Sequence, residues 1–279
     1  MRTTRSRWLA PLLLFGALAF AWAQRPFREY PAMEGANSEA ALPSDYQVPA
    51  GFVLGRLMFD SSREGGGPGR VAGGRSGGSW TVDYPCGDRT LAQALRRLTR
   101  IDVGSVEQPV SPDDGDDIYN WPYLHIGMPS NWNLTDAQAA KIRDYLLRGG
   151  FLLCDSFFGS REWEGFMIGM NKIFPHREII DIPDGDPVFG IVYNLQEKYQ
   201  VANFRSMRRS GAAVTYRADG KDPKWRGIRD DKGRLVVVMT VNNDLGDSWQ
   251  LADNVQYPEK YSALGIRLAV NFISYTLSH

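Results

Sequence analysis

An apolar run that ends in two reactive side chains, GGFLLCDSFFG, occupies residues 149–159. Cys154 and Asp155 stand where the run stops, before an aromatic pair and a further glycine. In an open α/β sheet, reactive groups lie beyond the carboxyl ends of the strands. The stretch therefore offers a thiol nucleophile or a strand-end acid, and the alternative is a strand that only leaves the core.

Cys154 lacks the neighbours that a catalytic thiol needs. A nucleophile elbow requires small residues on both sides of the nucleophile, and neither Leu153 nor Asp155 is small. A Cys–His pair also needs a histidine, and of the three in the chain one lies inside a predicted strand and one is the last residue. We expect Cys154 to pack as a buried thiol, and its pairing with Cys86 stays open.

Acidic side chains recur where predicted strands and turns end, and they are Asp83, Asp88, Asp155, Glu162, Asp244 and Asp247. Converging carboxylates can raise one pKa and create a general acid, or they can bind a hard cation. Asp155 and Glu162 are the candidate catalytic residues. The alternative is that each acid caps local structure, with Asp88 at a helix start and Asp247 in an Asx turn.

Aromatic residues fall in predicted loops near the same acids, and they are Trp80, Tyr84, Trp121, Trp132, Phe157, Phe158, Trp163 and Trp249. Such a rim suits sugar rings or a peptide, and the alternative is that these rings anchor loops to the core. Arg89 could clamp a carboxylate beside Asp88. The candidate ligand-binding residues are therefore Asp83, Asp88, Arg89, Asp155, Trp163, Asp244, Asp247 and Trp249.

The sequence motifs do not indicate a metal-binding or nucleotide-binding site. The chain has no C-x-x-C or H-E-x-x-H pattern, so we predict no metal and no cofactor. Residues 69–76 match a phosphate loop only loosely, because Arg75 replaces the lysine and no helix start follows. The basic run FRSMRRSG at 204–211 is expected to be a solvated loop.

Strand patterns alternate with helix patterns over most of the chain. Strands are predicted at 52–60, 106–110, 123–127, 151–155, 178–182, 212–217 and 234–241, and helices at 89–99, 136–148, 166–174 and 262–277. A capping box, Thr135 to Gln138, opens the second helix. The alternation predicts an α/β fold with a mostly parallel, flavodoxin-like sheet and helices on both faces.

The first 24 residues, MRTTRSRWLAPLLLFGALAFAWAQ, have the three parts of a signal peptide. We expect cleavage after Ala23 and secretion to the periplasm or cell envelope, with an uncleaved anchor as the alternative. An extended arm at 24–50 and one α/β domain at 51–279 would follow, with no transmembrane segment. Loss of residues 1–23 leaves 29 basic and 32 acidic side chains, which argues against a nucleic-acid partner.

Several segments together resemble the bacterial domain-of-unknown-function 4159 family. They are DYPCGDRTLAQALRRLT (83–99), YLLRGGFLLCDSFFG (145–159), IFP (173–175), DPVF (186–189) and VNNDLGDSW with the helix that ends the chain (241–279). The resemblance implies a class I glutamine-amidotransferase-like sheet over roughly 51–279. It also implies an envelope complex with AAA ATPase or von Willebrand A-type proteins, and it implies no established activity.

Two departures from the family pattern bear on chemistry. Many members have Gly-His-Gly where this chain has Gly127-Met128-Pro129, and many have His-Pro where it has Asp186-Pro187. Histidine-dependent chemistry is therefore not carried over. The sequence predicts a secreted envelope protein with a non-catalytic domain that binds a ligand or a protein. The alternative is a carboxylate-dependent hydrolase that acts on a glycan or peptide.

Overall fold

The computed structural model describes residues 25–35, 38–61 and 79–279. The predicted signal peptide at 1–23 and the loop at 69–76 therefore lie outside the described residues. The described parts of the arm, 25–35 and 38–50, form turns but no α-helix or strand. None of the helices in these described ranges is long and apolar enough to cross a membrane.

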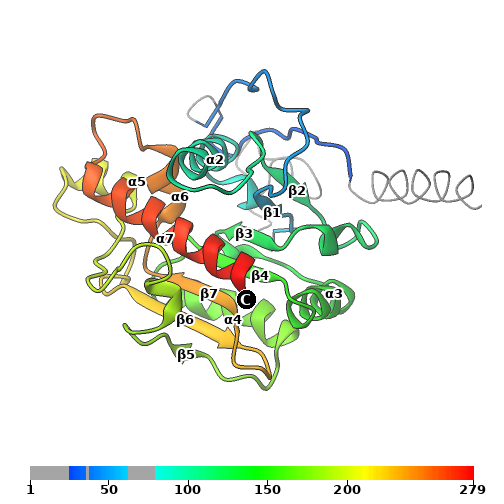
Figure 1. Ribbon diagram of the computed structural model, residues 1–279. Helices are drawn as coiled ribbons and strands as arrows, with labels where there is room; N and C mark the ends of the chain where they lie inside the picture. The colour runs from blue at the N-terminus through cyan, green and yellow to red at the C-terminus, as the bar shows by residue number, and fades with distance from the viewer. Residues whose placement is uncertain (1–24, 36–37, 62–78) are drawn as a thin grey trace, which may run out of the picture.

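One seven-stranded sheet forms the centre of the described chain (Figure 1). Its strands are β1 (Gly55–Leu57), β2 (Gln108–Val110), β3 (Tyr123–Gly127), β4 (Phe151–Asp155), β5 (Ile180–Asp181), β6 (Lys224–Arg229) and β7 (Leu235–Val241). They lie in the order β2-β1-β3-β4-β7-β6-β5. The first five pair in parallel, and β6 and β5 add an antiparallel edge. When the parallel strands alone are numbered, this is the flavodoxin-like order 2-1-3-4-5, which confirms the predicted fold class.

Helices cover both faces of this sheet (Figure 1). They are α2 (Cys86–Leu98), α3 (Asp136–Leu147), α4 (Gly159–Ile173), α5 (Phe204–Ser210), α6 (Leu245–Gln250) and α7 (Glu259–Ser278). Short 3-10 turns lie at Ser79–Thr81, Asp117–Asn120, Pro129–Asn131 and Pro187–Phe189. The buried side chains of α2, α6 and α7 pack on one face, and those of α3 and α4 pack on the other.

Alternation along β4 decides which helices its acid meets. Leu152 and Cys154 pack with the cluster under α3 and α4, whereas Phe151 and Leu153 pack with the cluster under α2, α6 and α7. Because side chains alternate across a strand, Asp155 shares the second face. The predicted strand is thus confirmed, and its terminal acid points toward α6.

A polar row crosses the sheet on this same face, and it consists of Arg56, His125, Asp155 and Thr240. Arg56 on β1 lies opposite His125 on β3. Gly127, two residues after His125, lies opposite Asp155 on β4, whose carboxylate accepts a hydrogen bond from Thr240 on β7. Strand register therefore brings residues from four segments of the sequence to the carboxyl half of the sheet.

The helix α3 begins as the capping box predicts. The Gln138 amide donates to the Thr135 hydroxyl at 3.2 Å, and the Thr135 amide donates to the Gln138 side chain at 2.9 Å. These two bonds satisfy amide groups that the first helical turn leaves without partners. Gly149, with a φ of +125°, follows the last turn and leads the chain into β4.

The edge of the sheet corrects one predicted strand. Residues 212–217 form no strand, and Ala212 has a φ of +69°, which a strand does not accommodate. The strand is β6 instead, which pairs antiparallel with β7 through a turn at 230–233. Its sequence KWRGIR contains charges and a glycine because the strand lies near the sheet edge, and this hid it from pattern analysis.

Several helix boundaries also differ from prediction. Asp88 does not cap α2, because the helix begins at Cys86 and Asp88 lies within its first turn. The basic run is helical as α5, and the segment that follows β7 contains α6. The helix α4 begins at Gly159, seven residues before the predicted start at Phe166. These elements are short or polar, so packing rather than periodicity determines where they begin.

Candidate functional site

Three of the predicted acids meet at the carboxyl end of the sheet. Asp155 accepts hydrogen bonds from the Thr240 hydroxyl, from the Ser156 hydroxyl at 3.1 Å and from the Gly246 amide at 2.9 Å. The acid therefore ties the end of β4 to β7 and to the first turn of α6. The side chain of Asp155 is 0% exposed.

Asp244 and Asp247 continue this network into the segment before α5. Asp244 accepts hydrogen bonds from the Ser156 hydroxyl at 2.6 Å and from the Asn203 side-chain amide at 2.8 Å. Asp247 accepts from the Phe204 amide at 2.7 Å and from the same Asn203 amide at 3.3 Å. Asp244 is also the N-cap of α6, so the Asx role predicted for Asp247 belongs to Asp244. Both carboxylates are buried and bonded within the protein.

Burial and repulsion between carboxylates raise the pKa of Asp155, Asp247 and Asp83. Burial raises the pKa of Asp155 to about 7, and the charge of Asp244 adds to the rise. Burial and the Asp244 carboxylate raise the pKa of Asp247 well above its usual value. Burial, followed by the Asp247 and Asp244 charges, has the same effect on the pKa of Asp83. The cluster thus has the perturbed acidities that functional sites often show, although structural networks show them too.

Asp83 differs from the other acids because its carboxylate has no hydrogen-bond partner among the described residues. It is 1% exposed and lies in the segment that connects β1 to α2. A Cβ atom at Gly246 would stand 2.0 Å from its Oδ2 atom, so the glycine permits the close approach. A buried carboxyl group without a partner is costly to fold, which makes Asp83 the strongest single candidate for a functional role.

Backbone strain gathers at the same edge. Among the described residues, six non-glycine residues have left-handed backbones, and four of them lie here: Asp83 (φ 59°), Met128 (φ 52°), Ser156 (φ 61°) and Asn242 (φ 62°). Met128, Ser156 and Asn242 each directly follow a strand, namely β3, β4 and β7. Left-handed backbone is costly for residues with a side chain, and it often clusters at functional sites.

The Arg56 end of the polar row pairs with α2. The Arg56 guanidinium lies 2.6 Å from the Asp88 carboxylate, and both side chains are buried. His125 is 2% exposed, and neither ring nitrogen has a hydrogen-bond partner in the part of the chain that is described. Burial, with a further contribution from the Arg56 charge, lowers the pKa of His125 well below its usual value. His125 is therefore neutral, and its ring packs edge-on against Trp249 at 5.0 Å between centroids.

Arg89 binds carboxylates, but not that of Asp88. It lies 3.2 Å from Glu107 and 2.6 Å from Glu29 of the arm. It also donates to the Ala40 carbonyl. The predicted clamp therefore holds two acids of the same chain, one of which belongs to the arm.

The arm crosses this part of the molecule at several other points. Gln250, the last residue of α6, donates to the Glu34 carboxylate at 2.9 Å. The Tyr30 amide donates to the Tyr84 hydroxyl at 3.1 Å. Figure 1 shows the described arm, in blue, beside α2 and β1. The arm thus covers the α2 and α6 side of the acid cluster.

Glu162 does not join the network of Asp155. It accepts the Phe158 amide at 2.8 Å and forms an ion pair with Arg217 at 3.0 Å. Among the described residues, Glu162 and Asp155 share no hydrogen-bond partner. Glu162 therefore has the geometry of a residue that stabilises the start of its own helix.

The aromatic residues are core rather than an exposed rim. Seven of the eight are buried, namely Trp80, Tyr84, Trp121, Trp132, Phe157, Phe158 and Trp249. Trp163 is half-buried and stacks on Phe157 at 6.3 Å between centroids. The anchoring alternative is therefore confirmed for seven of them, and only Trp163 offers part of an aromatic surface.

The two cysteines could act as thiols, and the acids could hold a metal ion. Cys86 and Cys154 are both free thiols. Burial raises the pKa of Cys154 well above its usual value, so the thiol is protonated and packs as predicted. Across the described ranges, no three or more His, Cys, Asp or Glu side chains are arranged to hold a metal ion.

Sequence reasoning missed the residues that connect the acids. Ser156, Asn203 and Thr240 each bond to at least one carboxylate of the cluster. Ser156 follows a predicted strand-end acid, so its place at the edge was accessible from the sequence. The polar row residues Arg56 and Thr240 were hidden because each lies within a strand whose other residues are mostly apolar.

The family assignment agrees with the resemblance found in the sequence. No curated protein is similar enough to this chain to count as a match. The family described as "Domain of unknown function (DUF4159)" matches residues 69–277, which include α2 to α7 and the acid cluster. The chain therefore belongs to this family of unknown function.

Proposed function

We propose that this chain is a secreted cell-envelope protein whose α/β domain binds a ligand or a partner protein and does not catalyse a reaction. The state of Asp155 carries this proposal, since its carboxyl group is 0% exposed and is bonded to Thr240, Ser156 and Gly246. A general acid must come within about 2.6–3.2 Å of the atom that takes its proton. An acid that is sealed and bonded in this way supports the end of the sheet instead.

The contact surface at this end would include the arm. Arg89 is engaged with Glu29, and α6 is engaged with Glu34, so a partner that approaches the acid cluster meets the arm first. Half-buried Trp163 and Glu162, both on α4, add an aromatic and a polar contact nearby, and Glu162 forms an ion pair with Arg217. The resemblance to the family suggests a partner from an envelope complex with a von Willebrand A-type domain or an AAA ATPase.

The alternative function is a carboxylate-dependent hydrolase acting on a glycan or peptide. Two observations favour it, namely the pKa of about 7 at Asp155 and the left-handed backbone of Ser156 directly after β4. Glu162 is the weaker half of the suggested pair, because its carboxylate is bonded to Arg217 and to the Phe158 amide. The alternative requires the arm or a neighbouring loop to open the edge.

Paired binding and turnover measurements separate the two functions. The full chain would be titrated calorimetrically with peptidoglycan fragments and assayed for hydrolysis of the same fragments and of chromogenic glycosides and peptides. The binding proposal expects heat without turnover, in the wild type and in the Asp155→Asn variant alike. Turnover that D155N abolishes, while the exposed-site control D181N retains it, would instead establish the hydrolase.

Secretion and partnership need separate tests. When the full gene is expressed, the protein recovered from the envelope fraction should have the mass of a chain whose first residue is Gln24. A protein that stays in the cytoplasm with residues 1–23 attached would contradict the secreted assignment. Crosslinking in intact cells should recover a von Willebrand A-type or AAA protein, and consistent recovery of neither would remove that partner class.

A further inference from the structure

A pocket of about 660 Å³ lies at the opposite end of the sheet from the acid cluster. Leu147 and Asp231, which line it, each come four residues before a parallel strand begins, β4 and β7 respectively. The segment after α4, with Phe174 and Arg177, completes the lining together with Ile180 of β5. The pocket is therefore at the amino ends of the strands, and its use does not depend on the function proposed above.

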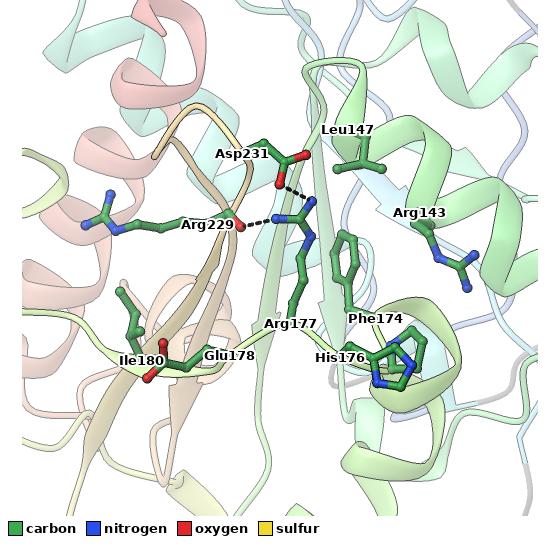
Figure 2. A pocket seen from close by; sticks show the side chains of 10 residues that line it. Arg143, Leu147, Phe174, His176, Arg177, Glu178, Ile180, Arg229 and Asp231 are labelled. Atoms are coloured by element: carbon green, nitrogen blue, oxygen red, sulfur yellow. Dashed lines mark hydrogen bonds and ion pairs between the residues drawn. The ribbon is translucent and has the colours of Figure 1, made fainter.

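Arg177 crosses the middle of this pocket (Figure 2). Its guanidinium donates to the Arg229 carbonyl at 3.0 Å and to the Asp231 carboxylate at 2.9 Å. It also lies 5.3 Å from the centroid of the Phe174 ring. Contacts on three sides fix the orientation of the guanidinium before any ligand arrives, which lowers the entropic cost of binding.

The other two arginines of the lining serve the fold. The Arg143 guanidinium donates to the Lys172 carbonyl at 2.6 Å and to the Ile173 carbonyl, where α4 ends. The Arg229 guanidinium donates to the Gly233 carbonyl at 2.6 Å and to Asp186. Figure 2 shows both side chains directed away from the centre, on opposite sides of Arg177.

Arg177 keeps capacity for an anion. A guanidinium has five N–H groups, and the described residues use two of those of Arg177. Asp231, its carboxylate partner in the described part of the chain, has a side chain that is 86% exposed. Exposed ion pairs contribute little free energy, so a ligand carboxylate can join or replace Asp231 and bind in the bidentate manner that guanidinium groups favour.

The walls beside Arg177 are apolar. Phe174 is 5% exposed at the base, and Leu147 is 43% exposed at the end of α3. Ile180 lies on the other side of Arg177, next to Glu178 (Figure 2). The volume falls within the roughly 300–1,000 Å³ of typical small-molecule sites, which combine an apolar lining with a few fixed polar groups.

We propose that this pocket binds a small organic acid, with its carboxylate held by Arg177 and its apolar body packed on Phe174, Leu147 and Ile180. The polar and apolar groups stand side by side, so both halves of such a ligand would be satisfied at once. A neutral ligand would leave the remaining N–H groups of Arg177 unused, and a bare anion would leave the apolar walls exposed to water.

Calorimetric titration of the full chain with phenylacetate tests the proposal. Phenylacetate should bind saturably, with a dissociation constant of roughly millimolar or tighter, which is usual for a ligand of this size. Phenylacetamide lacks the charge and acetate lacks the apolar body, so each should bind at least about tenfold more weakly. Absence of saturable phenylacetate binding, or equal affinity for either analogue, would overturn the proposal.

Two pairs of variants locate the site. Arg177→Gln should abolish phenylacetate binding, whereas Arg226→Gln should not, although both arginines are about equally exposed and lie 2.9 Å from an exposed aspartate. Leu147→Asp should abolish binding by charge repulsion, whereas Leu98→Asp should not. Leu98 is the matched control because it also ends a helix and is 47% exposed. Retained affinity in both R177Q and L147D would show that the ligand binds elsewhere.

Discussion

Arg56 on β1 and Asp88 on α2 form an ion pair at 2.6 Å in which neither side chain is more than 3% exposed. The pair joins the central sheet to the first long helix, and it explains why Asp88 points inward instead of capping that helix. Removal of one partner from a buried ion pair leaves an uncompensated charge in the core. The free-energy cost of that charge is far larger than the stabilisation that the intact pair provides. Loss of either partner of this pair should therefore destabilise the fold by much more than the intact pair stabilises it.

We predict that Asp88→Ala lowers the free energy of unfolding by about 3–5 kcal/mol, because Arg56 is left charged in the core. Urea denaturation at neutral pH measures the loss. The exposed ion pair of Arg96 and Asp45, whose charged atoms lie 2.8 Å apart, supplies the control. Asp45→Ala should cost far less than Asp88→Ala, because exposed ion pairs contribute little, and an equal loss in both variants would contradict the role assigned to burial.

Asp83→Asn should have the opposite effect and raise stability at neutral pH. Asp83 is as buried as Asp88, but its carboxylate has no partner among the described residues and is repelled by Asp244 and Asp247. Asparagine keeps the shape and tolerates the φ of +59°. We expect a gain of roughly 0.5–2 kcal/mol in urea denaturation, as is common when a residue held for function is replaced.

Asp88→Asn is the matched comparison for this variant, since it makes the same chemical change at a buried acid that has a partner. It should lower stability while D83N raises it. A loss of stability in D83N comparable to that in D88N would show that Asp83 is a structural acid, and it would remove the strongest single indication of a functional site at this edge.

The fold was largely predictable because the central strands are apolar and their helices amphipathic. The strand at 151–155 and the capping box at Thr135 were found at the residue level. The strand β6 was missed, because a near-edge strand with charges and Gly227 lacks the pattern of a buried strand. Short helices such as α6 were missed because tertiary contacts, not their own sequence, stabilise them.

The site was predictable in its position along the strands but not in its chemistry. The parallel topology implies that Asp155, Asp244 and Asp247 meet, and they do. Whether such acids face solvent or one another depends on their hydrogen bonds to Asn203 and Ser156. The sequence does not show these bonds, because they form only when the chain is folded. Glu162 illustrates the limit, because proximity in sequence placed it beside Asp155 while Arg217 holds it in a separate network.

Thr135→Ala should lower the free energy of unfolding by about 0.5–2 kcal/mol. The substitution removes the hydroxyl that accepts the Gln138 amide at 3.2 Å and so leaves a first-turn donor of α3 without a partner. Urea denaturation provides the measurement. Thr135→Ser retains the hydroxyl and should lose less than half as much, whereas equal losses would mean that the methyl group rather than the cap stabilises the helix.

The raised pKa of Asp155 predicts how stability depends on pH. An unfolded aspartate has a pKa near 3.9, whereas burial and the Asp244 charge raise the pKa of Asp155 to about 7 in the folded protein. Between about pH 4 and pH 7 the unfolded chain has lost this proton and the folded chain still holds it, so unfolding releases a proton. Stability from this group is therefore full below pH 4 and falls as pH rises toward 7.

The Asp155→Asn variant cannot bind or release this proton. Its free energy of unfolding should therefore rise relative to that of the wild type as pH increases from 4.5 to 7.5. We expect a relative gain of roughly 1–3 kcal/mol, because one pKa unit corresponds to about 1.4 kcal/mol. Asp184→Asn is the control, since the Lys198 ammonium lowers the pKa of that exposed acid and the difference from wild type should stay constant over this range. A constant difference for D155N as well would mean that Asp155 is ionised in the folded protein. The network of Ser156, Thr240 and Gly246 would then solvate a charge, and the raised pKa that favours Asp155 as a general acid of a hydrolase would be absent.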